Sequence, residues 1–120
     1  MMSTDAVFNL ADALSRLDQD EDLFYTLVEI FVEQVPMDMA ATQAALDAGD
    51  ANALARAAHR LKGAILQFSA PTALEATRQL EALGKTGTLD GAAAMCAHVD
   101  RELQKLLMAL RGHLANRPSA

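Results

Sequence analysis

Hydrophobic residues recur at three- and four-residue spacing along most of this chain, which is the pattern of amphipathic helices. The pattern predicts helices over residues 9–17, 20–49, 51–68, 71–83 and 92–114, separated by short polar or glycine-containing turns. β-branched residues are sparse and do not alternate with polar ones, so no strand is expected. The chain is therefore predicted to be all-α.

Local start and stop signals support these boundaries. Asp20 and Asp50 stand where an N-cap is needed, and Pro71 suits a first helical turn. Pro36 should kink the second helix without necessarily ending it, because proline removes one backbone donor. We expect Gly84 to end the fourth helix.

Short connections make neighbouring helices antiparallel, which predicts an up-down-up-down four-helix bundle with a short additional N-terminal helix. A length of 120 residues suits a single domain over 1–120, with a core at about 9–114 and a disordered tail. The sequence offers Leu, Ala and Met rather than aromatic residues to fill that core. Its expected members include Leu23, Leu27, Ile30, Phe31, Leu54, Leu61, Ile65, Met37, Met39, Met95, Cys96, Leu103 and Met108.

Charge and composition exclude several classes of partner. The net charge is −6 and no Lys/Arg cluster is present, which argues against nucleic acid or an anionic membrane as partner. No apolar run approaches the roughly 18 residues of a membrane span, and the N-terminus lacks a signal-peptide pattern. The single cysteine, Cys96, cannot form an internal disulfide and suits a reducing compartment. A cytoplasmic protein is expected.

The sequence carries no familiar metal or nucleotide motif. Zinc-ligand spacing, a phosphate-binding glycine loop and the ferritin-like carboxylate pattern are all missing. His98 and His113 lie on the last helix without ligand-type neighbours, so structural or solvated roles are expected for both. We therefore expect no metal and no cofactor of its own.

The predicted helix 51–68 differs from an ordinary surface helix on its outer face. His59 lies about 200° around the helix from the core residue Leu61, so it should point to solvent. Gly63 sits mid-helix at a cost of roughly 1 kcal/mol, which indicates either tight helix packing or an approach site for another protein. The outer face also carries Ala55, Arg56, Lys62 and Leu66.

These residue types favour nucleophilic chemistry at the histidine. A neutral imidazole is available near pH 7, because its unperturbed pKa is about 6.5. One ring nitrogen can attack phosphorus if an acceptor holds the proton on the other. Lys62 could neutralise phosphoryl oxygens, and Glu81 on the next helix is the best candidate for the acceptor.

The run Ala58-His59-Arg60-Leu61-Lys62-Gly63 closely resembles the AHxLKG signature of histidine phosphotransfer domains. The resemblance covers roughly residues 23–110, including FVEQVP and ALDAGD upstream of the histidine and Leu80-Glu81 downstream. A bare HxxKG would be weak, but with these flanks the resemblance is specific.

The resemblance implies a phosphocarrier that relays phosphoryl groups between receiver-domain aspartates. His59 would be the phosphoacceptor and would react through Nε2, Lys62 would lie beside the phosphoryl group, and Glu81 would orient the imidazole. Receivers would dock over Ala55, Arg56, Gly63 and Leu66. The implied partners are response-regulator receiver domains, which supply Mg²⁺, and a hybrid sensor kinase. The protein itself would be a monomer without kinase activity.

Two positions depart from the family pattern, and two other functions stay open. Ser69 stands where the family usually has glycine, and Ile65 replaces a commonly small residue. A non-phosphorylated adaptor that binds receivers is one alternative. The other is a phosphoacceptor domain excised from a chemotaxis-type kinase, although a start at Met1 favours a free-standing protein.

Overall fold

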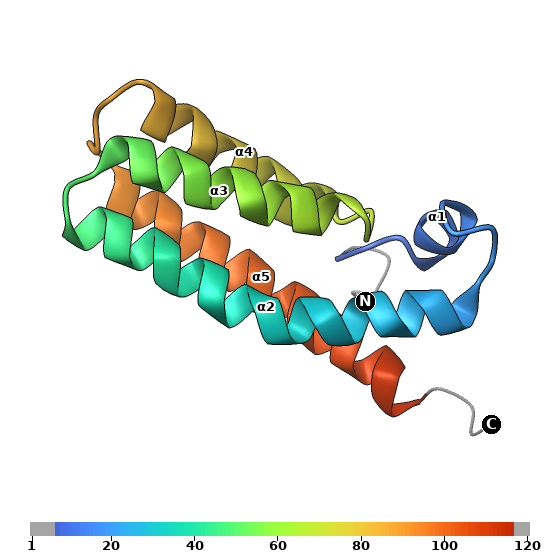
Figure 1. Cartoon of the computed structure of the whole chain (residues 1–120). Coiled ribbons are helices and arrows are strands. Elements are labelled where there is room, and N and C mark those ends of the chain that lie inside the picture. Colours follow the sequence, from blue (N-terminus) through green and yellow to red (C-terminus); the bar gives the residue numbers. More distant parts are fainter. Residues whose placement is uncertain (1–6, 117–120) are drawn as a thin grey trace.

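Five helices joined by short turns make up most of residues 7–116, which are the residues that the computed structural model describes (Figure 1). They are α1 (Leu10–Ser15), α2 (Glu21–Asp47), α3 (Ala51–Leu66), α4 (Pro71–Lys85) and α5 (Ala92–Ala115). This part of the chain contains no strand, so the all-helical prediction is confirmed. The part of the predicted disordered tail beyond Asn116 lies outside the described residues.

Side-chain caps begin three of the helices. The Asp20 carboxylate accepts a hydrogen bond from the Leu23 amide, and Asp50 does the same for Ala53. These contacts satisfy backbone donors that a helix start leaves free, as the sequence predicts. Asn9 caps α1 in the same way. Helix α4 has no side-chain cap and begins instead with Pro71, which has no N–H to satisfy.

Of the predictions for Pro36 and Gly84, the first agrees with the structure and the second does not. Pro36 lies inside α2, which continues to Asp47, so this proline does not end the helix. The prediction that Gly84 ends the fourth helix is wrong, because α4 continues through it to Lys85. The chain turns at Gly87 instead, where a φ of +84° favours a residue without a side chain.

The four long helices enclose one core (Figure 1). Helix α3 packs against α2 and α4, and α5 packs against α4 and α2, in a body of 48 × 28 × 22 Å. Helix α1 contacts α2 near the end of the body. The fully buried large side chains include Phe8, Phe24, Phe31, Leu54, Leu61, Ile65, Phe68, Leu80, Leu103 and Leu110. No helix of residues 7–116 is long and apolar enough to cross a membrane.

Some residues expected in the core lie on the surface. Leu23, Ile30 and Met37 of α2 are exposed, and so is Met108 of α5. The buried strip of α2 is centred instead on Phe24, Val28, Phe31 and Val35. The spacing of the exposed residues is helical, but they lie beside the strip that faces α3 and α5. Cys96 is buried as expected, and burial raises the pKa of its thiol.

Candidate functional site

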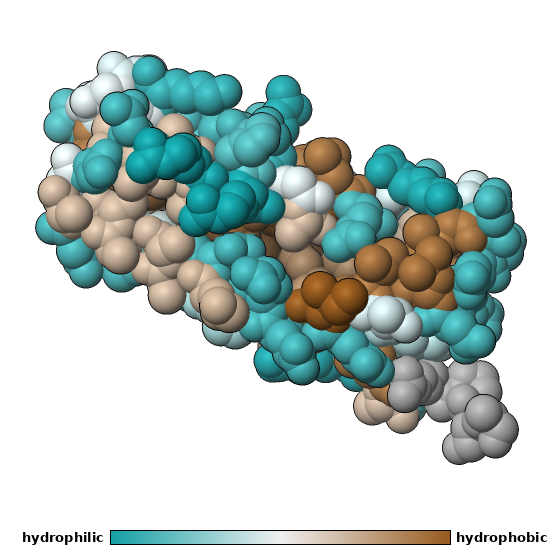
Figure 2. All heavy atoms as spheres, viewed as in Figure 1, coloured by the Kyte–Doolittle hydropathy of each residue, from teal (hydrophilic) through white to brown (hydrophobic). Residues whose placement is uncertain are grey.

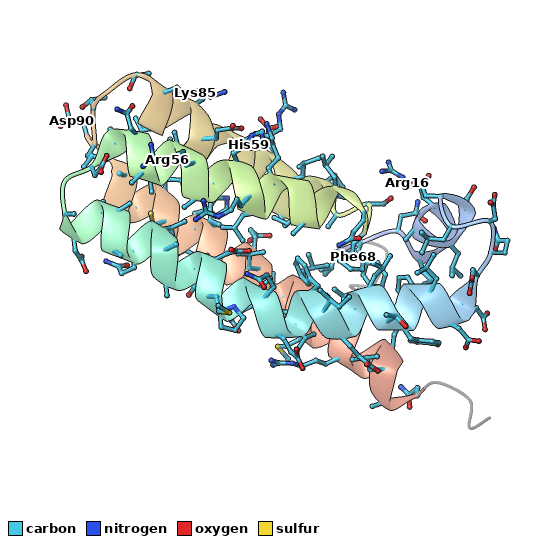
Figure 3. The ribbon with its side chains drawn as sticks, in the orientation of Figure 1. Arg16, Arg56, His59, Phe68, Lys85 and Asp90 are labelled. Carbon is cyan, nitrogen blue, oxygen red and sulfur yellow. The ribbon has the colours of Figure 1, made fainter. Side chains whose placement is uncertain are left out.

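His59 lies in the middle of α3 and points away from the core (Figure 3). Its side chain is 68% exposed, while Ala57, Ala58 and Leu61 beside it are buried. This placement follows from the helical period that puts the apolar residues of α3 on its inner face. An exposed imidazole on a rigid helix is accessible to another protein.

A buried carboxylate holds the imidazole from the neighbouring helix. Oε2 of Glu81 on α4 lies 2.8 Å from Nδ1 of His59, and the Glu81 side chain is only 6% exposed. An ionised carboxylate can only accept hydrogen bonds, so Nδ1 carries the proton and donates the hydrogen bond to Glu81. In the neutral ring, Nε2 then keeps its lone pair. The pairing that the sequence favoured for Glu81 is present in the structure.

Two lysines share the same carboxylate. Nζ of Lys62 donates to Oε1 of Glu81 at 2.6 Å, and Nζ of Lys85 lies 3.4 Å from Oε2. Glu81 therefore has the imidazole and Lys85 at one oxygen and Lys62 at the other. Lys85 was not among the predicted site residues, although its position four residues after Glu81 is the spacing of an ion pair on one helix.

These contacts keep Glu81 ionised although it is buried. The hydrogen bond from Lys62 contributes most to lowering the Glu81 pKa, from 4.5 to about 2. Burial opposes this shift, and the His59 hydrogen bond and the charges of Lys62 and Lys85 add to it. The site thus combines a permanent negative charge beneath the ring with positive charges around it.

The close approach of α3 and α4 brings these groups together. Gly84 lies one turn beyond Glu81, and a Cβ atom at this position would lie 2.8 Å from the Ala55 nitrogen and 2.9 Å from the Ala51 oxygen. Only a residue without a side chain fits there. The missing side chain lets the backbones of α3 and α4 pack in direct contact beside the site.

Of the four residues expected to dock a partner, three are exposed and one is buried. Leu66 and Arg56 are exposed, and a Cβ added to Gly63 would meet no atom within 4 Å. The tight-packing explanation of Gly63 is therefore wrong, because this glycine faces open space. The expectation that Ala55 belongs to the exposed face is also wrong, since Ala55 is buried against Gly84.

A hollow of about 380 Å³ lies next to the imidazole. It is lined by Ala55, Arg56, His59, Arg60, Glu81 and Lys85. Helix α3 contains Arg56, Arg60 and Lys62 and no acidic residue, so positive charge gathers around His59 in a chain of net charge −6. Such a surface favours an anionic group.

Comparison with known proteins agrees with this geometry. The sequence profile of the Hpt domain family matches residues 26–112, which is more than half of the chain. The chain belongs to the Hpt domain family. It is a histidine phosphotransfer carrier of phosphorelay signalling, as the sequence motif implied. Members of this family carry phosphoryl groups between receiver domains and are not kinases.

One solved structure resembles the whole fold of this Hpt protein. Histidine-containing phosphotransfer protein B (HptB) from Pseudomonas aeruginosa PAO1 superimposes with a TM-score of 0.86 at 25% sequence identity. The match covers 93% of this chain and 97% of that one. A search of curated protein sequences found no match.

Proposed function

We propose that His59 is the phosphoacceptor of this carrier and reacts through Nε2. The contact of 2.8 Å between Nδ1 of His59 and Oε2 of Glu81 carries the proposal. It fixes the proton on Nδ1 and leaves the lone pair on the outward nitrogen as the nucleophile. The exposure of His59 makes this nitrogen accessible to the phosphorylated aspartate of a receiver domain.

In the proposed step, the Nε2 lone pair forms a bond to phosphorus while the bond between phosphorus and the aspartyl oxygen breaks. The electron pair of that bond stays with the aspartate as its carboxylate. The Nδ1 proton does not move, so the phosphorylated ring becomes positively charged opposite the Glu81 carboxylate. This charge pairing stabilises the product, and reversing the same step passes the group to a second receiver.

Lys62 would neutralise the oxygens of the phosphoryl group, because its ammonium lies one helical turn from His59. Its side chain is 26% exposed, so it can turn from Glu81 towards Nε2. Mg²⁺ would be held by the receiver domain and not by this chain. The carrier's own contribution is then orientation and charge around one nucleophile.

The proposed docking surface consists of Arg56, Gly63 and Leu66 on α3, with exposed Leu23, Ile30 and Met37 on α2. Two observations support a position of these α2 residues on the same side as Arg56. Leu23, Ile30 and Met37 are seven residues apart, so they share one helix face with Ala41, Ala44 and Ala48. Those alanines line a hollow with Arg56 and Arg60. Figure 2 shows this face of the molecule, which is mostly hydrophilic over α3 and has hydrophobic side chains along the border between the N-terminal half of α2 and α1.

We also propose the finer architecture and setting. The short turns and the contacts of α3 and α5 with both neighbours support an up-down-up-down antiparallel bundle, with α1 as the additional helix. The single core supports one domain over 1–120. A monomer located in the cytoplasm, phosphorylated through a hybrid sensor kinase and its receiver, fits the relay function and the free thiol of Cys96.

The decisive experiment is phosphotransfer in vitro. Wild type, His59→Ala and His98→Ala are each incubated with a phosphorylated receiver domain of the same cell and Mg²⁺. His98 is a matched control, because it is another exposed histidine and lies on α5. Acid-labile, base-stable label on wild type and His98→Ala but not on His59→Ala is the expected result.

Other outcomes identify the alternatives. Binding of receivers without any label on wild type would contradict the proposal and favour a non-phosphorylated adaptor. Label that forms only from ATP and a separate kinase domain, never from a receiver, would favour a phosphoacceptor domain of a chemotaxis-type kinase.

A further inference from the structure

Two lysines of residues 7–116 contact the Glu81 carboxylate, and neither the motif nor the proposed step gives Lys85 a role. Its Nζ lies 3.4 Å from Oε2, the same oxygen that accepts the hydrogen bond from His59. Its side chain is 67% exposed and lines the hollow beside the imidazole. Figure 3 shows Lys85 and His59 along the edge where α3 and α4 lie side by side.

The two lysines reach Glu81 from opposite directions along α3. Lys62 follows His59 by three residues and does not line the hollow. Lys85 is next to Gly84, which packs against Ala51 and Ala55, on the turns that precede His59. The two ammonium groups also contact different oxygens of Glu81, so one can leave without displacing the other.

The Lys62 ammonium cannot bind Glu81 and a phosphoryl group on His59 equally well at the same time. In the structure it donates to Oε1 of Glu81 at 2.6 Å, the shortest contact among the three groups around this carboxylate. If His59 is phosphorylated, as proposed above, the phosphoryl oxygens compete for the same ammonium. Glu81 then loses its strongest partner when the ring needs an oriented carboxylate most.

We propose that Lys85 is a positioning residue that holds Glu81 against Nδ1 of His59 when Lys62 turns to the phosphoryl group. The movement of Lys62 to the phosphoryl group rests on the proposed phosphorylation of His59. The role of Lys85 in holding Glu81 can be tested without phosphate. Because Lys85 is exposed, its contribution is that of a surface ion pair, equivalent to about a two- to fivefold effect.

The first test uses the unphosphorylated protein, in which replacing Lys62 imitates its departure. The ¹⁵N NMR spectrum of His59 reports the fraction of the ring with its proton on Nδ1. It is measured in wild type, Lys62→Met, Lys85→Met and the double variant. We expect little change in either single variant and a clear loss of the Nδ1–H form in the double variant. A double variant that matches Lys62→Met would overturn the proposal, whether or not His59 accepts phosphate.

The second test measures phosphotransfer. Lys85→Met should slow transfer from a phosphorylated receiver to His59 by about two- to fivefold, because the imidazole is less well oriented as the nucleophile, and Lys85→Arg should restore the rate. Arg78→Gln is the matched control, because it removes one positive charge from an exposed position of α4 that pairs with Glu75. An equal slowing in Arg78→Gln would contradict a specific role for Lys85 and indicate a general charge effect. If wild type takes no label while the first test succeeds, the phosphoacceptor proposal fails and the lysine arrangement stands.

Discussion

Gly84 of α4 packs directly against the backbone of Ala55 in α3. A Cβ atom on Gly84 would lie 2.8 Å from the Ala55 nitrogen and 3.0 Å from its Cα. Backbone atoms of a helix cannot move aside as a side chain can, so the spacing of the two helices depends on this glycine. Glu81 and Lys85 lie on either side of Gly84 on the same helix, which links this spacing to the contacts of the imidazole.

Gly84→Ala should therefore destabilise the fold despite the better helix propensity of alanine. We expect a loss of about 1–3 kcal/mol in the free energy of unfolding, the usual cost of overpacking. The displaced α4 should also weaken the hydrogen bond between His59 and Glu81. Urea unfolding measures the first effect, and the ¹⁵N signals of His59 measure the second.

Gly112→Ala is the control, because this glycine also lies in a helix but its added Cβ would meet no atom within 4 Å. It should leave stability unchanged or raise it. Equal unfolding free energies for Gly84→Ala and wild type would contradict the close approach of α3 and α4.

Gly63→Ala should have opposite effects on stability and on transfer. The added Cβ meets no atom of this chain, so alanine should raise stability by about 0.5–1 kcal/mol through its helix propensity. The same methyl group would stand on the proposed docking surface and slow transfer from a receiver. Thermal unfolding and the transfer rate are measured together, with Gly112→Ala as a variant that can gain stability without losing rate. Unchanged transfer in Gly63→Ala would exclude close docking over this position.

The sequence predicts the helices and the contact between His59 and Glu81. Apolar spacing located all five helices, and the outward direction of His59 follows from the same period. The link from His59 to Glu81 was found because nucleophilic chemistry requires an acceptor on a neighbouring helix. A helical period alone does not fix how wide the buried strip is, so Ile30 and Met37 were wrongly assigned to the core.

Gly84 and Lys85 could not be predicted for a different reason. A glycine near the end of a helical pattern is usually a stop signal, and only the packed structure reveals that Gly84 meets the backbone of α3. Lys85 has the spacing of an ordinary surface ion pair with Glu81. Its relation to His59 depends on the rotation of α4, which the sequence pattern does not determine.

The low pKa of Glu81 makes part of the stability depend on pH. Its pKa of about 2 in the folded protein lies below the ordinary value of 4.5, so its ionisation stabilises the fold above pH 4.5. That contribution is lost as the pH falls from about 4.5 towards 2. We expect Glu81→Gln to lower the free energy of unfolding at pH 7 by about 1–3 kcal/mol, typical for hydrogen bonds to charged groups. The difference from wild type should shrink on acidification.

Urea unfolding at several pH values between 7 and 3 checks this expectation. Glu75→Gln is the matched control, because Glu75 is an exposed carboxylate of the same helix paired with Arg78. Its difference from wild type should be small throughout. A difference for Glu81→Gln that stays constant down to pH 3 would show that the carboxylate is not held by the three groups around it.

Ser69, in the turn that follows α3, adopts a left-handed backbone conformation that favours glycine. Its φ is +53°, in the left-handed region that costs most residues roughly 1–2 kcal/mol. In this chain the serine hydroxyl donates to the carboxylate of Asp12 in α1 and lowers the pKa of that group. Asp12 also binds Arg16, which donates to the Leu66 carbonyl at the end of α3. The hydroxyl thus joins a network between α1 and α3.

Two substitutions separate the cost of the backbone from the gain of the hydroxyl. Ser69→Ala loses the hydrogen bond and keeps the unfavourable φ, so it should destabilise the fold. Ser69→Gly loses the same bond but adopts this φ freely, so it should be more stable than Ser69→Ala by about 1 kcal/mol. Chemical unfolding of the three proteins measures both differences. Equal stability of the alanine and glycine variants would mean that the turn relaxes when the hydroxyl is removed, and that the contact with Asp12 holds Ser69 in the left-handed conformation.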